Sequence, residues 1–444
     1  MSWERTKLSD FLTERDGRIK HEHANNLGLQ RIKKIDFSGY IHLDAETNTS
    51  TDMIRAKNGD LVISGINAAK GAIAVYEGDD DVLATIHYSA YEFNSDLISV
   101  DFLKWFFKSP EFSDLLKKQI PGGIKTELKP KHILPLQVKL PKLSEQIKIA
   151  KRLNEFQLGH LNLEQEIEHQ ETLLAKLQQA ILQEAIQGKL TADWRATHPN
   201  VEPASQLLHR IQAEKARLIA AKQLRPARPL PKITPEKLPF AIPKTWEWCR
   251  LEDICGFITK GTTPAPHELK KTGDIPFLKV YNIREQKIDF NYQPQFIERR
   301  VHEGKLARSV VYPKDVLMNI VGPPLGKVAI VPEEYAECNI NQALAVFRPV
   351  DIKISQFLYL YLCEGAPIRA TVTKGVVGQD NISLTQCRAL VFPVPPLAEQ
   401  GAIVERVDAL MATCRALELE IEHARTHTAQ LLQAVLKEAF SEAS

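Results

Sequence analysis

One long segment occurs twice in the sequence, and this repeat constrains the fold more than any other feature. Residues 143–186 and 397–440 align without a gap and share 19 identities in 44 positions. Each copy begins within a related phrase, "PKLSEQ" (141–146) or "PPLAEQ" (395–400). An ungapped match of this length indicates an internal duplication.

Both copies are predicted to be long helices that pair with each other. Glycine and proline are absent after the first turn, apart from Gly159 and Gly401, and good helix formers dominate. About 40 residues at 1.5 Å each give a helix of roughly 60 Å. Apolar residues at alternating spacings of three and four predict a heptad seam in the same register in both copies, and a stripe this narrow needs a partner helix. The predicted seam consists of Leu153, Phe156, Leu163, Ile167, Leu174, Leu177 and Ile181, and of Val407, Leu410, Leu417, Ile421, Leu431 and Val435.

The segment before each long helix has the pattern of an α+β domain. "WERTKLSDF" from Trp3 recurs weakly as "WEWCRLEDI" from Trp246, and short Val, Ile and Phe runs alternate with Gly, Pro and Asn turns. A short amphipathic helix follows at 99–112 and at 354–368. We therefore expect two domains of mixed or antiparallel strands with short helices, separated by an antiparallel coiled coil.

The domain limits follow from these patterns, since 444 residues exceed one compact core. The central region contains one more predicted helix (202–223) and a proline-rich, extended connector that ends near residue 243. The predicted parts are a first domain (1–140), a central region (141–239), a second domain (240–394) and a C-terminal helix (395–444).

Composition excludes several classes of protein. The formal net charge is only +2, so any nucleic-acid surface must be a local patch. No run of eighteen apolar residues is present, and the start lacks the apolar core of a signal peptide, so we expect a cytoplasmic protein without membrane contact. The six cysteines form no C-x-x-C pair, which favours reduced, buried thiols and no metal site.

The common catalytic motifs are missing. The sequence contains no G-x-x-x-x-G-K-[ST] loop, no G-x-G-x-x-G, no H-E-x-x-H and no G-x-S-x-G. "IVGPPLG" (320–326) lies near the N/D-P-P-Y/F motif of amino-methyltransferases, but Gly322 and Leu325 replace its polar and aromatic residues. We predict no catalytic residue, and a duplicated chain without a catalytic constellation favours recognition over catalysis.

Several phrases in this order resemble the specificity subunit of bacterial type I restriction-modification systems. They are P-x-L-x-E-Q before each long helix, "AIQGKLTADW", "LPFAIPKTWEWCRLEDI", "ITKGTTP", "IPFLKVYNI", "VLMNIVGPPLGKVAIVP" and "CNINQALAVFRP". The resemblance covers essentially the whole chain. The first domain departs most, because it has no equivalent of "KGTTP".

The resemblance implies a non-catalytic subunit whose two target recognition domains each read one half of a bipartite, asymmetric sequence in double-stranded DNA. It also implies two docked methyltransferase subunits, joined by restriction and translocase subunits. S-adenosylmethionine, ATP and Mg²⁺ would be bound by these partners and no cofactor by this chain.

Candidate DNA contacts are basic and amide side chains on glycine-containing loops, which suit phosphates and base edges. An ordinary solvated loop is the alternative for each. In the first domain they are Arg15, Arg18, Lys20, Arg31, Lys33, Lys34, Lys125 and Thr126. In the second domain they are Lys260, Thr262, Thr263, Lys279, Tyr281, Asn282, Arg284, Lys374, Gln379 and Asn381.

Two questions stay open at the level of sequence. Glu145, Gln146, Glu399 and Gln400 recur where each helix leaves its domain, and a cap, a partner contact or an interdomain contact would explain them equally. The function also has rivals, namely a two-headed coiled-coil scaffold that binds proteins through its globular domains, and, less favoured, a catalytic methyltransferase or nuclease.

Overall fold

The chain folds into two compact units. The computed structural model describes residues 3–15, 17–37, 39–44, 50–119, 127–227, 229–322, 324–369, 373–374 and 380–441. Unit 1 comprises Met1–Glu171 with Leu419–Ser444, and unit 2 comprises Thr172–Glu418. The division falls inside both long helices, because each globular domain packs on the start of one helix and the end of the other.

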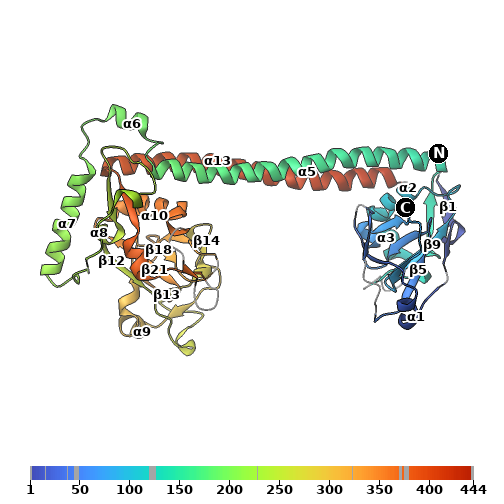
Figure 1. Ribbon diagram of the computed structural model, residues 1–444, viewed down its shortest axis with the longest axis horizontal. Coiled ribbons are helices and arrows are strands. Elements are labelled where there is room, and N and C mark those ends of the chain that lie inside the picture. Colours follow the sequence, from blue (N-terminus) through green and yellow to red (C-terminus); the bar gives the residue numbers. More distant parts are fainter. Residues whose placement is uncertain are drawn as a thin grey trace. The chain divides into compact units, whose positions relative to one another are not determined.

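The two repeats form helices α5 (Leu143–Ile186) and α13 (Leu397–Phe440), each 44 residues long. In unit 1, Leu153 near the start of α5 shares a hydrophobic cluster with Leu436 near the end of α13. In unit 2, Ile181 near the end of α5 shares a cluster with Val407 near the start of α13. The helices are therefore antiparallel in each unit, which confirms the predicted coiled coil (Figure 1).

The seam between the helices is narrower than predicted. Positions spaced by seven from Leu153 and from Val407 point inward and are buried or half-buried. Phe156 is half-buried, but the other leucines predicted at the intermediate positions are 36 to 48% exposed, namely Leu163, Leu177, Leu410, Leu417 and Leu431. A single partner helix covers only a narrow stripe, so these leucines flank the contact instead of filling it.

The first domain is built from strands in two four-stranded sheets and one two-stranded sheet. The sheet orders are β2-β9-β6-β7, β4-β3-β8-β5 and β1-β10. The elements are β1 (Glu4–Lys7), β2 (Leu12–Glu14), α1 (His21–Asn26), β3 (Arg31–Ile35), β4 (Ile41–Asp44), β5 (Met53–Ala56), β6 (Leu61–Ser64), β7 (Ile73–Val75), β8 (Val82–Thr85), β9 (Tyr88–Phe93), α2 (Val100–Lys108), α3 (Pro110–Gln119), α4 (Pro130–Ile133) and β10 (Gln137–Leu140).

The second domain follows two helices, α6 (Ala192–Thr197) and α7 (Ala204–Ala220), and the proline-rich connector. Its main sheets have the orders β12-β21-β18-β19, β16-β13-β20-β17 and β11-β24. The elements are β11 (Glu247–Arg250), α8 (Leu251–Ile254), β12 (Cys255–Lys260), β13 (Ile275–Leu278), β14 (Ile283–Arg284), β15 (Lys287–Ile288), β16 (Phe296–Ile297), α9 (Arg299–Glu303), β17 (Val310–Val311), β18 (Val316–Asn319), β19 (Val328–Ile330), β20 (Cys338–Ile340), β21 (Leu344–Pro349), α10 (Ser355–Glu364), α11 (Ala366–Arg369), β22 (Thr373–Lys374), β23 (Asp380–Asn381), α12 (Leu384–Ala389) and β24 (Val391–Val394).

The two domains share one topology although their sequences have diverged. Each four-stranded sheet of one domain has a counterpart with the same strand order in the other, so β2 corresponds to β12 and β3 to β13. Even the parallel pair in an otherwise antiparallel sheet recurs, as β3 with β8 and as β13 with β20. The duplication therefore includes the globular domains as well as the helices.

A tryptophan joins each domain to the helix pair. Glu4 is paired with Leu140, and Glu247 with Val394, so Trp3 and Trp246 stand at the same register just before their strands. Trp3 packs edge-on against Phe102 of α2 and against Phe440 at the end of α13. In the other repeat Trp246 packs edge-on against Phe357 of α10 and shares a cluster with Ile186 at the end of α5.

Gln146 and Gln400, the glutamines of the two repeated phrases, make equivalent hydrogen bonds. The Gln146 side chain is buried and donates to the Pro141 carbonyl over 2.9 Å, and Gln400 donates to Pro395 over 2.9 Å. Each glutamine thus closes the turn through which the last strand of the domain enters its helix. Gln146 also accepts a hydrogen bond from the Ser99 amide at 2.9 Å.

The neighbouring glutamates, Glu145 and Glu399, differ in burial and in their partners. Glu399 is fully buried and accepts hydrogen bonds from Thr191 Oγ1 (2.8 Å), from Trp246 Nε1 (2.9 Å) and from the Arg195 guanidinium. Glu145 is 45% exposed and pairs with Lys148 one turn along the helix. The same residue is an interior anchor in one repeat and a surface residue in the other.

This difference predicts unequal effects of the same substitution. Glu399→Gln removes the negative charge beside the part-buried Arg195 and should cost about 2 kcal/mol of unfolding free energy. Glu145→Gln, the matched control, should leave the midpoint of urea-induced unfolding unchanged. Equal midpoints for the two variants would contradict the assigned role of Glu399.

Candidate functional site

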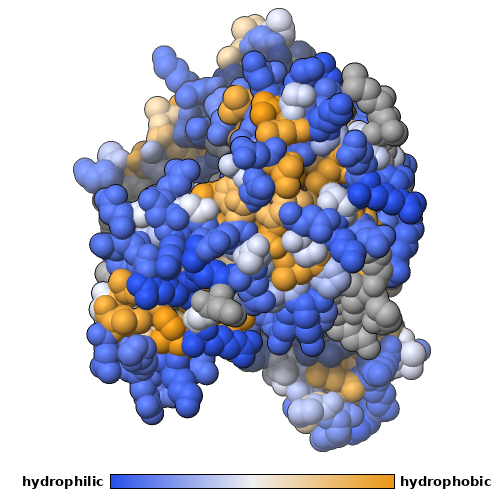
Figure 2. All heavy atoms as spheres, turned by 90° about the vertical axis from the view of Figure 1, so that its right-hand side faces the viewer, coloured by the Kyte–Doolittle hydropathy of each residue, from blue (hydrophilic) through white to orange (hydrophobic). Residues whose placement is uncertain are grey.

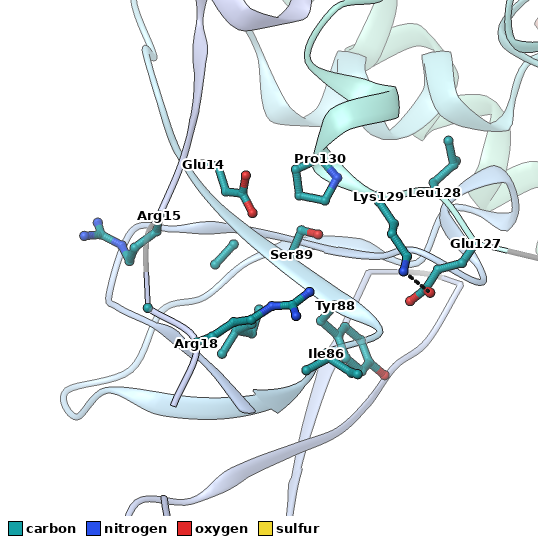
Figure 3. A pocket seen from close by; sticks show the side chains of 13 residues that line it. Glu14, Arg15, Arg18, Ile86, Tyr88, Ser89, Glu127, Leu128, Lys129 and Pro130 are labelled. Atoms are coloured by element: carbon teal, nitrogen blue, oxygen red, sulfur yellow. Dashed lines mark ion pairs between the residues drawn. The ribbon is translucent and has the colours of Figure 1, made fainter. Parts of the chain in front are cut away.

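The loop after β2 borders a cleft in the first domain. The cleft has a volume of about 320 Å³ and lies between this loop, the start of β9 and residues 127–130. In Figure 3 Arg18 extends toward Tyr88 and Ile86, whereas Arg15 points away from them. Because β2 corresponds to β12, this loop is the topological counterpart of the "KGTTP" loop, which the sequence of the first domain did not reveal.

Arg15 supports this loop from inside the domain. Its Nε and Nη2 donate to the carboxylate of Asp60 at 2.5 and 2.7 Å, and Nη2 also pairs with Glu92 at 2.8 Å. The hydrogen bond to Asp60, which is only 1% exposed, raises the pKa of Arg15 further. Its Nε and Nη2 groups are engaged within the protein, which makes Arg15 a support of the loop, and the DNA contact expected for it stays a prediction.

The other basic residues of the first domain lie mostly at its surface. Arg18 and Lys20 are exposed, and Arg31 is half-buried with a protein partner. Lys33 and Lys34 are consecutive in β3 yet both exposed, because the pairing with β4 shifts by one residue between Ile32 and Lys34. The predicted contacts Lys125 and Thr126 lie outside the described residues.

Gly261 fixes the corresponding loop of the second domain. A Cβ atom at this position would lie 2.1 Å from the Ile340 carbonyl oxygen and 2.2 Å from that of Asn341, so only glycine fits. Lys260 is exposed at the end of β12, and Thr263 is exposed on the loop. Thr262 Oγ1 accepts hydrogen bonds from Arg308, a residue that the sequence analysis did not single out.

Four side chains of the second domain form a cluster of alternating basic and aromatic groups. The Arg284 guanidinium lies 4.4 Å from the ring centroid of Tyr292, and Lys279 Nζ lies 5.9 Å from that of Tyr281. The two tyrosines meet edge to face at 6.1 Å. Burial lowers the pKa of Lys279 and raises the pKa of Tyr281. Such groups suit a nucleic-acid backbone and its bases, and Tyr292 was missed because "NYQPQF" carries no basic residue.

Asn282 lies beneath this cluster and is only 1% exposed. Its Oδ1 accepts the Lys279 amide at 2.9 Å, and its Nδ2 donates to the carbonyls of Asp289 (3.3 Å) and Tyr292 (2.8 Å). All these partners are backbone groups of the same loop. Asn282 is thus a buried support of the loop, and the base contact expected for it stays a prediction.

The last three predicted contacts are only partly described. Lys374 belongs to β22, but its side chain and Gln379 lie outside the described residues. Asn381 is exposed in β23, has a protein partner, and forms a bridge with Val321. The Gly322 amide donates to the Asp380 carbonyl at 3.1 Å, so Gly322 lies beside β23.

The described residues offer no metal cluster, and most of the cysteines are buried. Among them, no three His, Cys, Asp or Glu side chains come together as metal ligands. Five of the six cysteines are buried, and burial raises the pKa of Cys338 and of Cys387 to about 12, so their thiolates are scarce. None of the described helices combines the length and the hydrophobicity needed to span a bilayer.

Hydrophobic side chains also reach the surface (Figure 2). In the first domain, Phe37, Tyr40 and Leu43 are exposed on and around the β3–β4 hairpin. Tyr40 and Leu43 line a groove of about 620 Å³ together with Val75, Val100 and other residues. A groove of this kind suits a protein partner.

The chain is similar to proteins described as specificity subunits of type I restriction enzymes. Residues 243–424 match the family model described as "Type I restriction modification DNA specificity domain". The chain is 27% identical over 435 residues to the type I restriction enzyme EcoAI specificity subunit of Escherichia coli, covering 86% of this chain and 72% of that protein. It is 28% identical over 291 residues to the EcoEI specificity subunit of Escherichia coli, covering 62% of this chain and 46% of that protein.

The fold agrees with these sequence matches. A solved structure described as "Structural basis underlying complex assembly and conformational transition of the type I R-M system" superposes with a TM-score of 0.66 at 18% identity. The match covers 99% of this chain and 97% of that one. At this identity the similarity establishes the fold alone.

Measurements of stability can test the contrast between Arg15 and Arg18 on the loop after β2. Arg15→Met leaves the buried carboxylate of Asp60 without its cation and should cost about 3 kcal/mol of unfolding free energy. Arg18→Met, on the same loop but exposed, should leave stability unchanged. Thermal unfolding of both variants measures the contrast, and an Arg15→Met protein as stable as the wild type would contradict the supporting role of Arg15.

Proposed function

We propose that the chain is a specificity subunit of a type I restriction-modification system, and that it reads a bipartite DNA target and catalyses no reaction itself. One observation carries the proposal. Two domains whose main sheets have the same strand order bear unlike side chains at corresponding places, Arg18 and Lys20 after β2, and Lys260 at the end of β12 with Thr262 and Thr263 after it. Shared scaffolds with different loops suit the two unlike halves of an asymmetric target.

The candidate contact residues divide by chemistry into two groups. Arg18, Lys20, Lys33, Lys34 and Lys260 would hold phosphates, because their charges carry no sequence information. The cluster of Lys279, Tyr281, Arg284 and Tyr292 is better suited to base edges or unstacked bases. Arg284 is the strongest candidate for a base contact, since it is exposed and its plane is supported by the Tyr292 ring.

The helix pair would set the distance between the two half-sites. Half-sites on one face of duplex DNA must lie about a helical turn or a multiple of it apart. The helices α5 and α13, each 44 residues long, would serve as such a spacer. We propose that the spacer length of the DNA target depends on the length of these helices.

The leucines beside the seam are the proposed docking surface for methyltransferase subunits. In unit 2, Leu177, Leu410 and Leu417 are exposed in spite of their heptad positions, and in unit 1 Leu163 and Leu431 are exposed. A further helix from a partner would cover them. We propose two methyltransferase subunits, joined by restriction and translocase subunits in the cytoplasm. These partners would bind S-adenosylmethionine, ATP and Mg²⁺.

Mapping of methylated bases tests the proposed function. The chain is expressed with the subunits encoded beside it in a host free of DNA methylation, and N6-methyladenine is located by single-molecule sequencing. We expect one bipartite motif that disappears when this gene is deleted, and Arg284→Ala should relax or abolish only one half of it. Active partner subunits without any bipartite motif would contradict the proposal.

Substitution of the exposed leucines tests the docking surface. Leu410→Glu with Leu417→Glu should weaken binding of the methyltransferase subunit at least about tenfold, because a partner would bury two charges. Glu420→Lys, exposed on the same helix, is the control for a change of charge. The measurement is affinity by calorimetry, and unchanged affinity of the double-leucine variant would place docking elsewhere.

A protein-binding scaffold is the second candidate, favoured only by the groove beside Tyr40 and Leu43. The same methylation map separates the two functions. A scaffold would leave the motif intact when Arg284 is replaced, and would lose its partner when Tyr40 is replaced.

A further inference from the structure

The segment after α5 is held on the start of α13 by two charged residues of that helix. Thr191 and Arg195 bind the Glu399 carboxylate, as described above. Seven residues further along, about two helical turns, Arg406 Nη1 donates to both carboxylate oxygens of Asp193 at 2.7 and 3.0 Å. A single short stretch, "TADWR" (191–195), thus offers a hydroxyl and a guanidinium to the glutamate and a carboxylate to the arginine.

The first repeat keeps both holding residues. In the ungapped alignment Glu399 corresponds to Glu145 and Arg406 to Arg152, with the same spacing of seven residues on one helix face. The strand register places both glutamates equally, five residues beyond the Leu140 that pairs with Glu4 and the Val394 that pairs with Glu247. Glu145 and Arg152 therefore form the counterpart of the filled site.

This counterpart is open among the described residues. Glu145 is paired only with its exposed neighbour Lys148, at 3.5 Å, and Arg152 is exposed and has no ion-pair partner there. Leu97, whose carbonyl accepts a hydrogen bond from the Gln146 side chain at 3.1 Å, is also exposed by about half. A carboxylate and a guanidinium are thus presented together on one face of the helix start.

We propose that Glu145 and Arg152 bind a segment of the methyltransferase subunit that offers an arginine and a carboxylate two residues apart, as Asp193 and Arg195 do in the filled copy. This proposal rests on the proposed function, which supplies such a partner. A second copy of this chain is a poorer occupant, because its own Thr191 is only 1% exposed and bound to its own Glu399. The filled repeat thus defines the chemistry of the ligand for the open one.

A peptide with the sequence of residues 188–199 is the probe. The internal segment 188–199 is tethered to its site, which gives it a high effective concentration there. A peptide added to the full chain therefore cannot displace this segment and should bind at the open site. We expect one peptide per chain by calorimetry. Glu145→Gln with Arg152→Gln should weaken binding at least about tenfold, since two charge-assisted contacts are lost.

The controls use the same helix and the same peptide. Lys151→Gln with Glu155→Gln, both exposed beside the site, should leave the affinity unchanged. Arg152→Glu should lose affinity for the natural peptide and regain it for a peptide with Asp193→Arg. The methyltransferase subunit should compete with the peptide, and its own affinity should fall in the Glu145→Gln, Arg152→Gln variant.

Three results would overturn the proposal. They are no binding of the peptide at about 1 mM, where specific contacts should be detectable; equal binding by the doubly substituted chain; and a peptide that still binds when the methyltransferase subunit is saturating. A dimer of this chain that the double substitution dissolves would identify a second copy as the occupant instead. None of these measurements uses DNA, so the proposal can fail while the methylation map still supports the proposed function.

Discussion

The packing of a tryptophan between its own domain and the far end of the other repeat's helix is the interaction on which the structure depends. Trp3 contacts Phe440, and Trp246 lies in one cluster with Ile186. Each cluster requires the start of one long helix and the end of the other. Neither repeat can therefore complete its core alone, and the antiparallel pairing of α5 and α13 follows from how the domains are built as much as from the seam.

Because the core depends on these contacts, the loops after β2 and β12 can differ in sequence between the two domains. The core contacts lie at the strand that leads into the helix and at the short helix that follows, where Phe102 and Phe357 occupy corresponding places. The loops after β2 and β12 take no part in those contacts. They can therefore carry a salt-bridged arginine in one domain and a glycine pressed against two carbonyl groups in the other, without a change of topology.

The sequence predicts best what depends on local order along the chain. The two helices and the short α2 and α10 were expected because helical periodicity is a local signal. The exposure of Leu163 and Leu410 was not, since the same spacing occurs whether one or two partner helices cover it. The supporting contacts of Arg15 and Asn282 were not expected for a related reason: Arg15 binds Asp60, forty-five positions away, and the burial of Asn282 depends on how its own loop folds. Basic and amide residues on glycine-rich loops look alike until their partners are known.

The residues of the two repeated phrases do not all keep the same contacts in both copies. Gln146 and Gln400 keep one function because their partners, Pro141 and Pro395, lie five residues away and are duplicated with them. Glu145 and Glu399 differ because the partners of Glu399 come from α6 and from Trp246, and α6 follows only one of the two repeats within the described residues. A duplicated residue keeps its function where its neighbours are duplicated too. Where they are not, the buried copy shows which chemical groups would satisfy the exposed one.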